Sequence, residues 1–214
     1  MSAIDLIIFD CDGVLVDTEE ASSRAMAEAI ALLGQALPWQ EVHRRFTGMM
    51  LADIVTAIEQ DIGRSVPPDW LATFRRMATH AFAAGVEPVA GVPELLADLG
   101  VDCCVASNGP REKMAITLGA AGLLAFFEPR MFSAYDVARG KPAPDLFLHA
   151  AAARKAVPQR CLVIEDSAAG LAAASAAGMH AAWYCPGDLP DRAGTHRLRA
   201  MAEVPGLLTR LGAG

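Results

Sequence analysis

The chain has 214 residues, 53% of them hydrophobic, which is enough to bury a substantial core as one domain with an inserted subdomain. Its formal net charge of −7 argues against a surface for nucleic acid or an anionic membrane, because either would need a basic patch. No apolar stretch of about 18 residues lacks a charged or polar break, and residues 1–5 do not resemble a signal peptide, so we expect a cytoplasmic protein without a membrane span.

The first predicted element is a buried strand that ends in carboxylates. Asp10 and Asp12 directly follow the apolar run Leu6-Ile7-Ile8-Phe9. Since alternate strand residues lie on one side, both acids can reach a common point at the carboxyl end, where open parallel sheets bind ligands. A calcium loop fails on spacing, because Val14 and Ala21 stand where an EF-hand needs oxygen ligands. A solvated turn remains an alternative for this motif taken alone.

Helical patterns fill the next part of the chain. Apolar residues recur at helical spacing from Ala21 to Leu33, and two further helices are predicted over residues 51–62 and 69–84. Asp17, with Glu20 three residues later, resembles a capping box. No strand pattern occurs between residues 18 and 84, and Gly and Pro gather between residues 85 and 93. We therefore place a helical subdomain at residues 17–85, inserted into a domain made of residues 1–16 and 86–214.

Helices and strands alternate after this insertion. Strands are predicted to end at Ser107 and Ile164, with short ones near Met131 and over residues 181–184. The intervening helices are predicted to begin at Pro93, Pro110, Asp145 and Ala168. This alternation predicts an α/β fold with a Rossmann-like parallel sheet flanked by helices. The tail from Pro186 onward is rich in turn residues and predicts little.

Three further polar motifs occur in this part of the chain, and two of them directly follow apolar runs. Ser107-Asn108-Gly109-Pro110 places a hydroxyl and turn amides after one strand, and Glu165-Asp166 places two acids after another. Lys141 lies between Gly140 and Pro142, in a stiff loop. A lysine taken alone is more often a solvated surface residue, but the chain has only three lysines. In the pair Glu165-Asp166, one of the two acids can simply face solvent. Their recurrence at strand ends favours a functional site.

Together and in this order, the four motifs resemble those of the haloacid dehalogenase superfamily, in its magnesium-dependent phosphatase branch. The resemblance covers the core from Asp10 to Ser167. Three further stretches are similar to the small sugar-phosphate phosphatases of the β-phosphoglucomutase-like branch, including those that hydrolyse 6-phosphogluconate: Ser23-Arg24-Ala25, Arg45-Phe46-Thr47-Gly48 and Phe132-Ser133-Ala134-Tyr135-Asp136. The resemblance implies that the helical insertion is a mobile cap and that the substrate is a small phosphorylated metabolite.

The resemblance also implies roles for seven residues. Asp10 is the expected nucleophile, which forms an aspartyl-phosphate, and Asp12 the general acid and base. The expected ligands of Mg²⁺ are Asp10, Asp12 through its backbone carbonyl, Glu165 and Asp166. The expected phosphate-binding residues are Ser107, Asn108 and Lys141.

Four other functions compete with the hydrolysis of a phosphate ester. A haloacid dehalogenase lacks the second aspartate, Asp12, and a phosphonoacetaldehyde hydrolase needs a cap lysine that residues 17–84 do not contain. A non-catalytic sensor of Mg²⁺ and phosphate would not need Asp12. The remaining alternative is a β-phosphoglucomutase-like phosphotransferase, which carries a cap histidine near the position of Ser22. The absence of that histidine favours water as the phosphoryl acceptor.

The cap composition gives a further expectation about the substrate. The insertion carries arginines but no lysine, so we expect an anionic polyol phosphate such as 6-phosphogluconate, with Arg45 and Gly48 as candidate contacts. The five cysteines have no metal-binding spacing and are expected to be reduced core residues. Among them, Cys11 should point away from Asp10 and Asp12.

Overall fold

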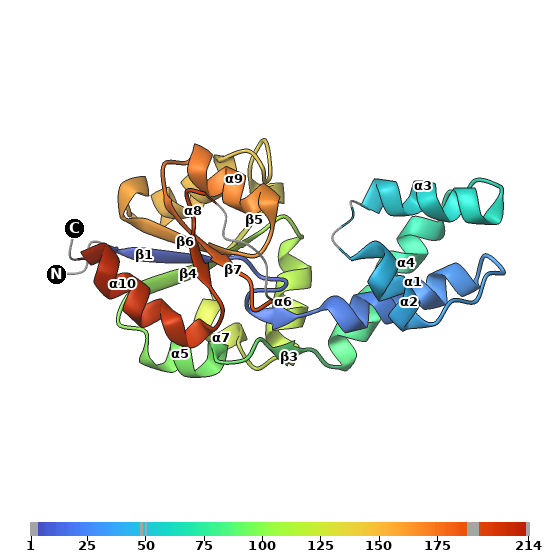
Figure 1. Ribbon diagram of the computed structural model, residues 1–214, viewed down its shortest axis with the longest axis horizontal. Helices are drawn as coiled ribbons and strands as arrows, with labels where there is room; N and C mark the ends of the chain where they lie inside the picture. The colour runs from blue at the N-terminus through green and yellow to red at the C-terminus, as the bar shows by residue number, and fades with distance from the viewer. Residues whose placement is uncertain (1–3, 48, 50, 188–192, 213–214) are drawn as a thin grey trace. The chain divides into compact units, whose positions relative to one another are not determined.

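The computed structural model describes residues 4–47, 49, 51–187 and 193–212, and it divides the chain into two compact units (Figure 1). One unit contains residues 1–16 and 87–214, and the other contains residues 17–86.

The first unit is built on a six-stranded sheet with the strand order β5-β4-β1-β6-β7-β8. Its strands are β1 (Leu6–Phe9), β4 (Asp102–Ser107), β5 (Met131–Ser133), β6 (Cys161–Glu165), β7 (His180–Tyr184) and β8 (His196–Leu198). Every pair of neighbouring strands is parallel. The first strand lies between β4 and β6, so that Ile8 pairs with Cys104 on one side and Val163 on the other. The predicted parallel α/β sheet is confirmed.

Helices cover both faces of this sheet, which explains why β1 is apolar at every position (Figure 1). Ile7 and Phe9 pack toward one face and Leu6 and Ile8 toward the other. The first face is covered by α5 (Val92–Asp98), α6 (Arg111–Ala120), α7 (Leu124–Phe127) and α10 (Val204–Gly212). The second face is covered by α8 (Asp145–Ala153) and α9 (Ala168–Ala176). Cys11 belongs to the first cluster, as the alternation predicted.

Short elements connect these parts. Strands β2 (Val16–Asp17) and β3 (Glu87–Pro88) form a two-stranded sheet at the two points where the insertion begins and ends. Three 3-10 turns complete the unit: η1 (Ala134–Asp136), η2 (Pro158–Arg160) and η3 (Met201–Glu203).

The second unit is helical. It contains α1 (Glu19–Ala31), α2 (Trp39–Phe46), α3 (Leu51–Ile62) and α4 (Trp70–Ala84). Trp70 is buried, and its indole N–H donates a hydrogen bond of 2.7 Å to the Ala29 carbonyl, which ties α4 to α1. The ring of Trp70 also stacks on Phe74, with centroids 6.3 Å apart.

The structure confirms most of the elements expected from the sequence, but α2, α7, β8 and α10 were not anticipated. The capping box expected from Asp17 and Glu20 is wrong. The helix begins one residue later, after Thr18, so Asp17 accepts from the Glu19 amide while Glu20 pairs with Arg24. The five cysteines are buried free thiols, as expected. Within the described ranges no helix is both long and apolar enough to cross a membrane.

Candidate active site

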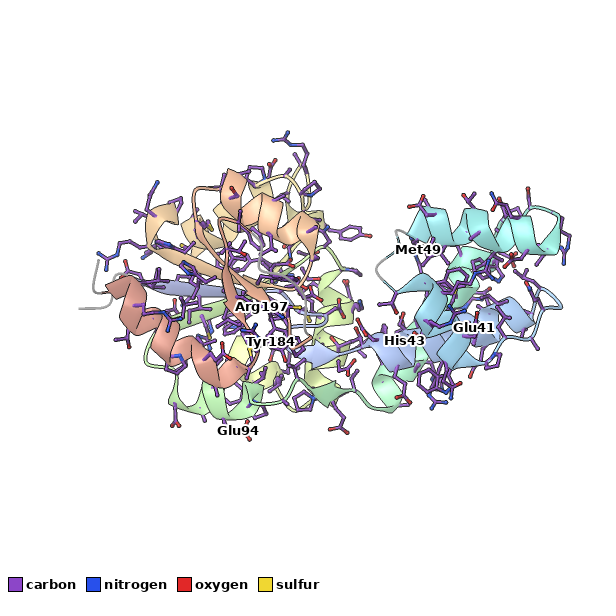
Figure 2. The ribbon with its side chains drawn as sticks, viewed as in Figure 1. Glu41, His43, Met49, Glu94, Tyr184 and Arg197 are labelled. Atoms are coloured by element: carbon purple, nitrogen blue, oxygen red, sulfur yellow. The ribbon has the colours of Figure 1, made fainter. Side chains whose placement is uncertain are left out.

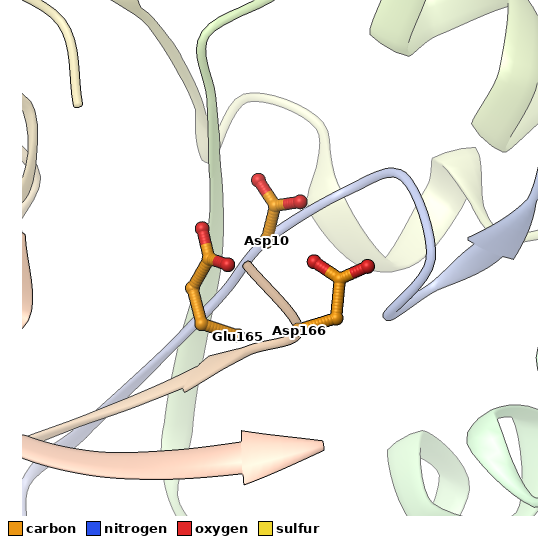
Figure 3. A group of neighbouring side chains, drawn as sticks. All are labelled: Asp10, Glu165 and Asp166. Atoms are coloured by element: carbon orange, nitrogen blue, oxygen red, sulfur yellow. The ribbon is translucent and has the colours of Figure 1, made fainter. Parts of the chain in front are cut away.

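The carboxyl ends of β1, β4 and β6 bring together residues that are far apart in the sequence, because these three strands are neighbours in the sheet. Asp10 directly follows β1, and its amide continues the pairing by donating 2.9 Å to the Ile164 carbonyl. Glu165 ends β6 and Asp166 follows it. Figure 3 shows the three carboxylates directed into the same space, where one ligand atom from each lies within 4.8 Å of the others.

Lys141 lies at the centre of these acids. Its ammonium nitrogen is 2.5 Å from Asp10 Oδ1 and 2.7 Å from Glu165 Oε1, and only 4% of its side chain is exposed. The same nitrogen lies 5.0 Å from the centre of the Phe147 ring, which provides a cation–π contact. Lys141 is therefore a buried site residue and not a solvated surface lysine.

Asn108 anchors the loop that carries this lysine. Its side chain accepts from the Lys141 amide at 2.8 Å and donates to the Lys141 carbonyl at 3.1 Å. Ser107, at the end of β4, is buried, and its hydroxyl accepts from the Gly109 amide at 3.0 Å. The side chain of Asn108 is thus a positioning group, while Ser107 places its hydroxyl at the same edge of the sheet.

Glu165 is held from several directions and is only 1% exposed. Its Oε2 accepts from both the amide and the hydroxyl of Ser167, each at 2.8 Å, and its Oε1 faces Lys141. A Cβ at Gly170 would lie 1.8 Å from Oε1, so only glycine leaves room for this carboxylate at the start of α9.

Asp166 is positioned by two other residues. Gly13 has φ +77°, and a Cβ there would lie 2.2 Å from Asp166 Oδ2, so both backbone geometry and space require glycine. The indole N–H of Trp183 donates 3.2 Å to the Asp166 carbonyl. Arg197, which Figure 2 labels, lies on β8, and its guanidinium carbon is 5.6 Å from the centre of that indole ring.

The electrostatics of the site favour an added cation. Asp10, Glu165 and Asp166 with one ammonium leave a formal charge of −2 in a largely buried space. Burial raises the pKa of Asp10 to about 7, with Glu165 and Asp12 adding to the rise and Lys141 opposing it. Burial likewise raises the pKa of Asp166 to about 7, and Asp10 and Glu165 add to it. For Lys141, burial lowers the pKa, but the two carboxylates more than offset this, so its pKa is raised.

This donor set fits a magnesium ion. Carboxylate oxygens gathered at one point are ligands that Mg²⁺ prefers, and a divalent cation would offset the burial and the neighbouring charges that raise the pKa values of Asp10 and Asp166. A thiol or imidazole cluster, which would indicate zinc, does not occur among the described groups of possible ligands.

Asp12 has a partner that sequence reasoning did not identify. Lys113, in the first turn of α6, places its ammonium 2.8 Å from Asp12 Oδ2, and both side chains are about one-third exposed. The available signal was composition, since the chain has only three lysines and two of them contact the two aspartates after β1.

The helical unit contains a cavity of its own, of about 230 Å³. Its polar lining consists of Thr18, Glu19, Ser22, Ser23 and Thr47. His43, on α2 (Figure 2), lies behind this lining, with Nδ1 3.2 Å from the Ser23 hydroxyl and 3.3 Å from the Thr47 hydroxyl.

Of the two residues expected to contact the substrate, Arg45 lies within the described ranges. The Arg45 guanidinium is 2.5 Å from Asp61 and does not line the cavity. Gly48 lies outside the described residues. Arg24, another cap arginine, pairs with Glu20 at 2.8 Å and lies over the Trp39 ring. Together with Arg44, which pairs with Glu41, three of the six arginines in residues 17–86 are engaged in ion pairs.

Comparison with known proteins agrees with this geometry. A family model described as haloacid dehalogenase-like hydrolase matches residues 4–178, and the chain belongs to that family. It is an enzyme of the phosphatase type, as the motifs predicted. The 6-phosphogluconate phosphatase of Escherichia coli (strain K12) is 34% identical over 186 residues, which cover 86% of this chain and 84% of that protein.

Two solved structures share the whole architecture. A haloacid dehalogenase-like protein from Agrobacterium tumefaciens is 30% identical with a TM-score of 0.82, and the match covers 97% of this chain and 99% of that one. A family hydrolase from Deinococcus radiodurans R1, solved with bound phosphate and sodium, is 31% identical with a TM-score of 0.80, covering 99% and 98%.

Proposed function

We propose that the protein is a cytoplasmic, Mg²⁺-dependent phosphatase that hydrolyses a small sugar or sugar-acid phosphate through an aspartyl-phosphate on Asp10. The observation that carries this proposal is the contact of Lys141 with Asp10 and Glu165 beside Asp166, at the carboxyl end of the central strand. A carboxylate nucleophile needs a cation that neutralises the incoming phosphoryl group, and this geometry supplies one within hydrogen-bonding distance.

The first half of the reaction transfers the phosphoryl group to the enzyme. A carboxylate oxygen of Asp10 attacks phosphorus, and the bond from phosphorus to the ester oxygen breaks. Asp12 donates a proton to that oxygen, which leaves as an alcohol. Lys141 neutralises the transferring group, while the Ser107 hydroxyl and the backbone amides after it bind phosphoryl oxygens.

The second half returns the phosphoryl group to water. Asp12, now ionised, takes a proton from a water molecule, whose oxygen attacks phosphorus, and the bond to Asp10 breaks to release inorganic phosphate. Mg²⁺, when bound by Asp10, the Asp12 carbonyl, Asp166 and Glu165, would neutralise charge on the phosphoryl oxygens. Asp10 stays ionised more readily in its presence, because the cation offsets the burial and crowding that raise its pKa.

The helical unit is proposed to choose the leaving group. The resemblance and the Escherichia coli relative support 6-phosphogluconate as the substrate. The hydroxyls and the one carboxylate that line the cavity of the helical unit also support the phosphate of a neutral polyol. A panel of phosphogluconate, hexose and hexitol phosphates, nucleotides and phosphoglycolate separates these classes. The highest kcat/KM identifies the leaving group.

The decisive experiment compares the wild type with Asp10→Asn and tests both acceptors. Phosphate release should require Mg²⁺, should stop after EDTA treatment, and should be absent in Asp10→Asn. Near-normal hydrolysis of p-nitrophenyl phosphate by that variant would overturn the mechanism. Running β-glucose 1-phosphate isomerisation in parallel tests the phosphotransferase alternative, which predicts glucose 6-phosphate with little free phosphate.

A further inference from the structure

We propose that Lys113 is a positioning residue for the acid–base carboxylate Asp12. The inference rests on the proposed function, because it concerns how Asp12 is presented to the leaving group. No motif of the sequence analysis includes Lys113, so the assignment derives from the geometry of α6 and of the loop before it.

The path of the lysine side chain runs across the phosphate-binding loop. A Cβ built on Gly109 would lie 3.4 Å from Lys113 Cδ and 3.4 Å from the Ser107 hydroxyl. The methylenes of Lys113 therefore lie against Gly109 of the phosphate-binding loop, and its ammonium reaches Asp12 Oδ2 at 2.8 Å.

A second contact one turn along α6 fixes the same loop. Thr117, four residues after Lys113, lies 3.8 Å from the Cys11 sulfur through its hydroxyl. That hydroxyl also donates to the Lys113 carbonyl at 3.1 Å. Residues 113 and 117 lie on one helix face, so α6 contacts two successive residues of the turn that carries Asp12.

Each of the two lysines contacts one of the two aspartates that follow β1. Lys141 contacts the nucleophile Asp10, and Lys113 contacts the acid–base residue Asp12. By holding Oδ2 at 2.8 Å, Lys113 restrains the orientation in which the Asp12 carboxyl group meets the leaving oxygen. Proton transfer requires a heavy-atom distance of about 2.6 to 3.2 Å, so loss of this restraint weakens acid catalysis without removing the acid.

The test uses two substrates that differ in their need for a proton. The p-nitrophenolate leaving group departs without help, whereas the alkoxide of glycerol 2-phosphate needs a proton. The quantity measured is kcat/KM, which covers the first half-reaction. Lys113→Met should lower kcat/KM for glycerol 2-phosphate by about tenfold or more, as expected for partial loss of acid catalysis. For p-nitrophenyl phosphate the change should stay below about threefold.

Four further variants complete the experiment. Asp12→Asn should show the same selectivity more strongly, and adding Lys113→Met to it should cost nothing more, because the lysine acts through Asp12. Lys113→Arg should recover part of the activity on glycerol 2-phosphate and serves as the folded variant if the methionine protein does not fold. Lys155→Met, at an exposed loop lysine, is the matched control and should behave as the wild type.

Equal losses on both substrates, no loss on either, or an additive loss in the double variant would overturn the inference. The first result would make Lys113 a phosphate-binding residue, and the second would make the ion pair structural. A result that refutes the proposed function can be distinguished from one that refutes the role of Lys113, because it would appear as phosphatase activity in Asp10→Asn.

Discussion

Asp10→Asn should stabilise the metal-free protein while it destroys turnover. Asp10 is only 9% exposed, and burial with its carboxylate neighbours raises its pKa from 3.8 to about 7. The folded state therefore keeps the Asp10 proton to higher pH than the unfolded state does. The free energy of unfolding must then fall as pH rises from about 4 to about 7, because the unfolded chain binds fewer protons than the folded one.

The size of the effect follows from this difference. At about 1.36 kcal/mol per pH unit, the rise from 3.8 to about 7 sets an upper limit of about 4 kcal/mol at pH 8. Asparagine keeps the shape and removes the charge, and Lys141 retains Glu165 at 2.7 Å. We expect a gain of about 2 kcal/mol, or about 4 to 8 °C in Tm for a chain of this length.

The assay is thermal unfolding in EDTA across pH 4 to 8 for wild type and variant. The difference in Tm should be largest at pH 8, shrink toward pH 4, and shrink again when Mg²⁺ is added to both proteins. Asp98→Asn, at an exposed aspartate that ends α5, should show no such pH dependence. A variant less stable than wild type at pH 8, or a difference independent of pH, would refute the reasoning.

Three other expectations concern the metal and the lysine loop. Because the pKa of Asp166 is raised to about 7, Mg²⁺ must displace protons when it binds at low pH. The Mg²⁺ concentration that gives half of the maximal stabilisation should therefore fall as pH rises from 5.5 to 8. Calorimetry in two buffers should detect the release of protons. Gly13→Ala should weaken Mg²⁺ binding by about tenfold or more, since its Cβ would overlap Asp166, whereas Gly34→Ala, at a similar positive φ with open space around it, should not. Asn108→Ala should lower kcat by about tenfold, because it frees the loop that carries Lys141, and should lower the free energy of unfolding by about 1 to 3 kcal/mol. An unchanged kcat would contradict the role of Asn108 in positioning this loop.

The fold was predictable where the chain repeats a simple pattern. The alternation of helices and strands after the insertion indicated a parallel sheet correctly, and the apolar run from Leu6 to Phe9 is buried on both faces of that sheet. Helix α2 was missed because it is short and strongly polar, with only Val42 and Phe46 buried. Strand β8 was missed because two of its three residues are polar and it lies at the sheet edge, where only Leu198 is fully buried.

The candidate site was predictable to the level of strand ends and no further. The order of motifs indicated that Asp10, Lys141 and Glu165 would meet, and the structure brings them together. Contacts made by long side chains across loops carry no periodic signal, so the pairing of Lys113 with Asp12 could not be read from the sequence. The same holds for the cap arginines, whose charge is visible in the composition but whose acidic partners are not.

The position of β1 in the sheet has a consequence for how the protein is made. This strand precedes both of its partners in the sequence by a long distance, because they begin only at Asp102 and Cys161. During synthesis the apolar segment Leu6–Phe9 must therefore remain unpaired while the helical insertion forms from local contacts. Asp5 and Asp10 flank that segment, and charges in such places act as gatekeepers against aggregation. The aspartate proposed as nucleophile would then protect the nascent chain long before it meets a phosphate ester.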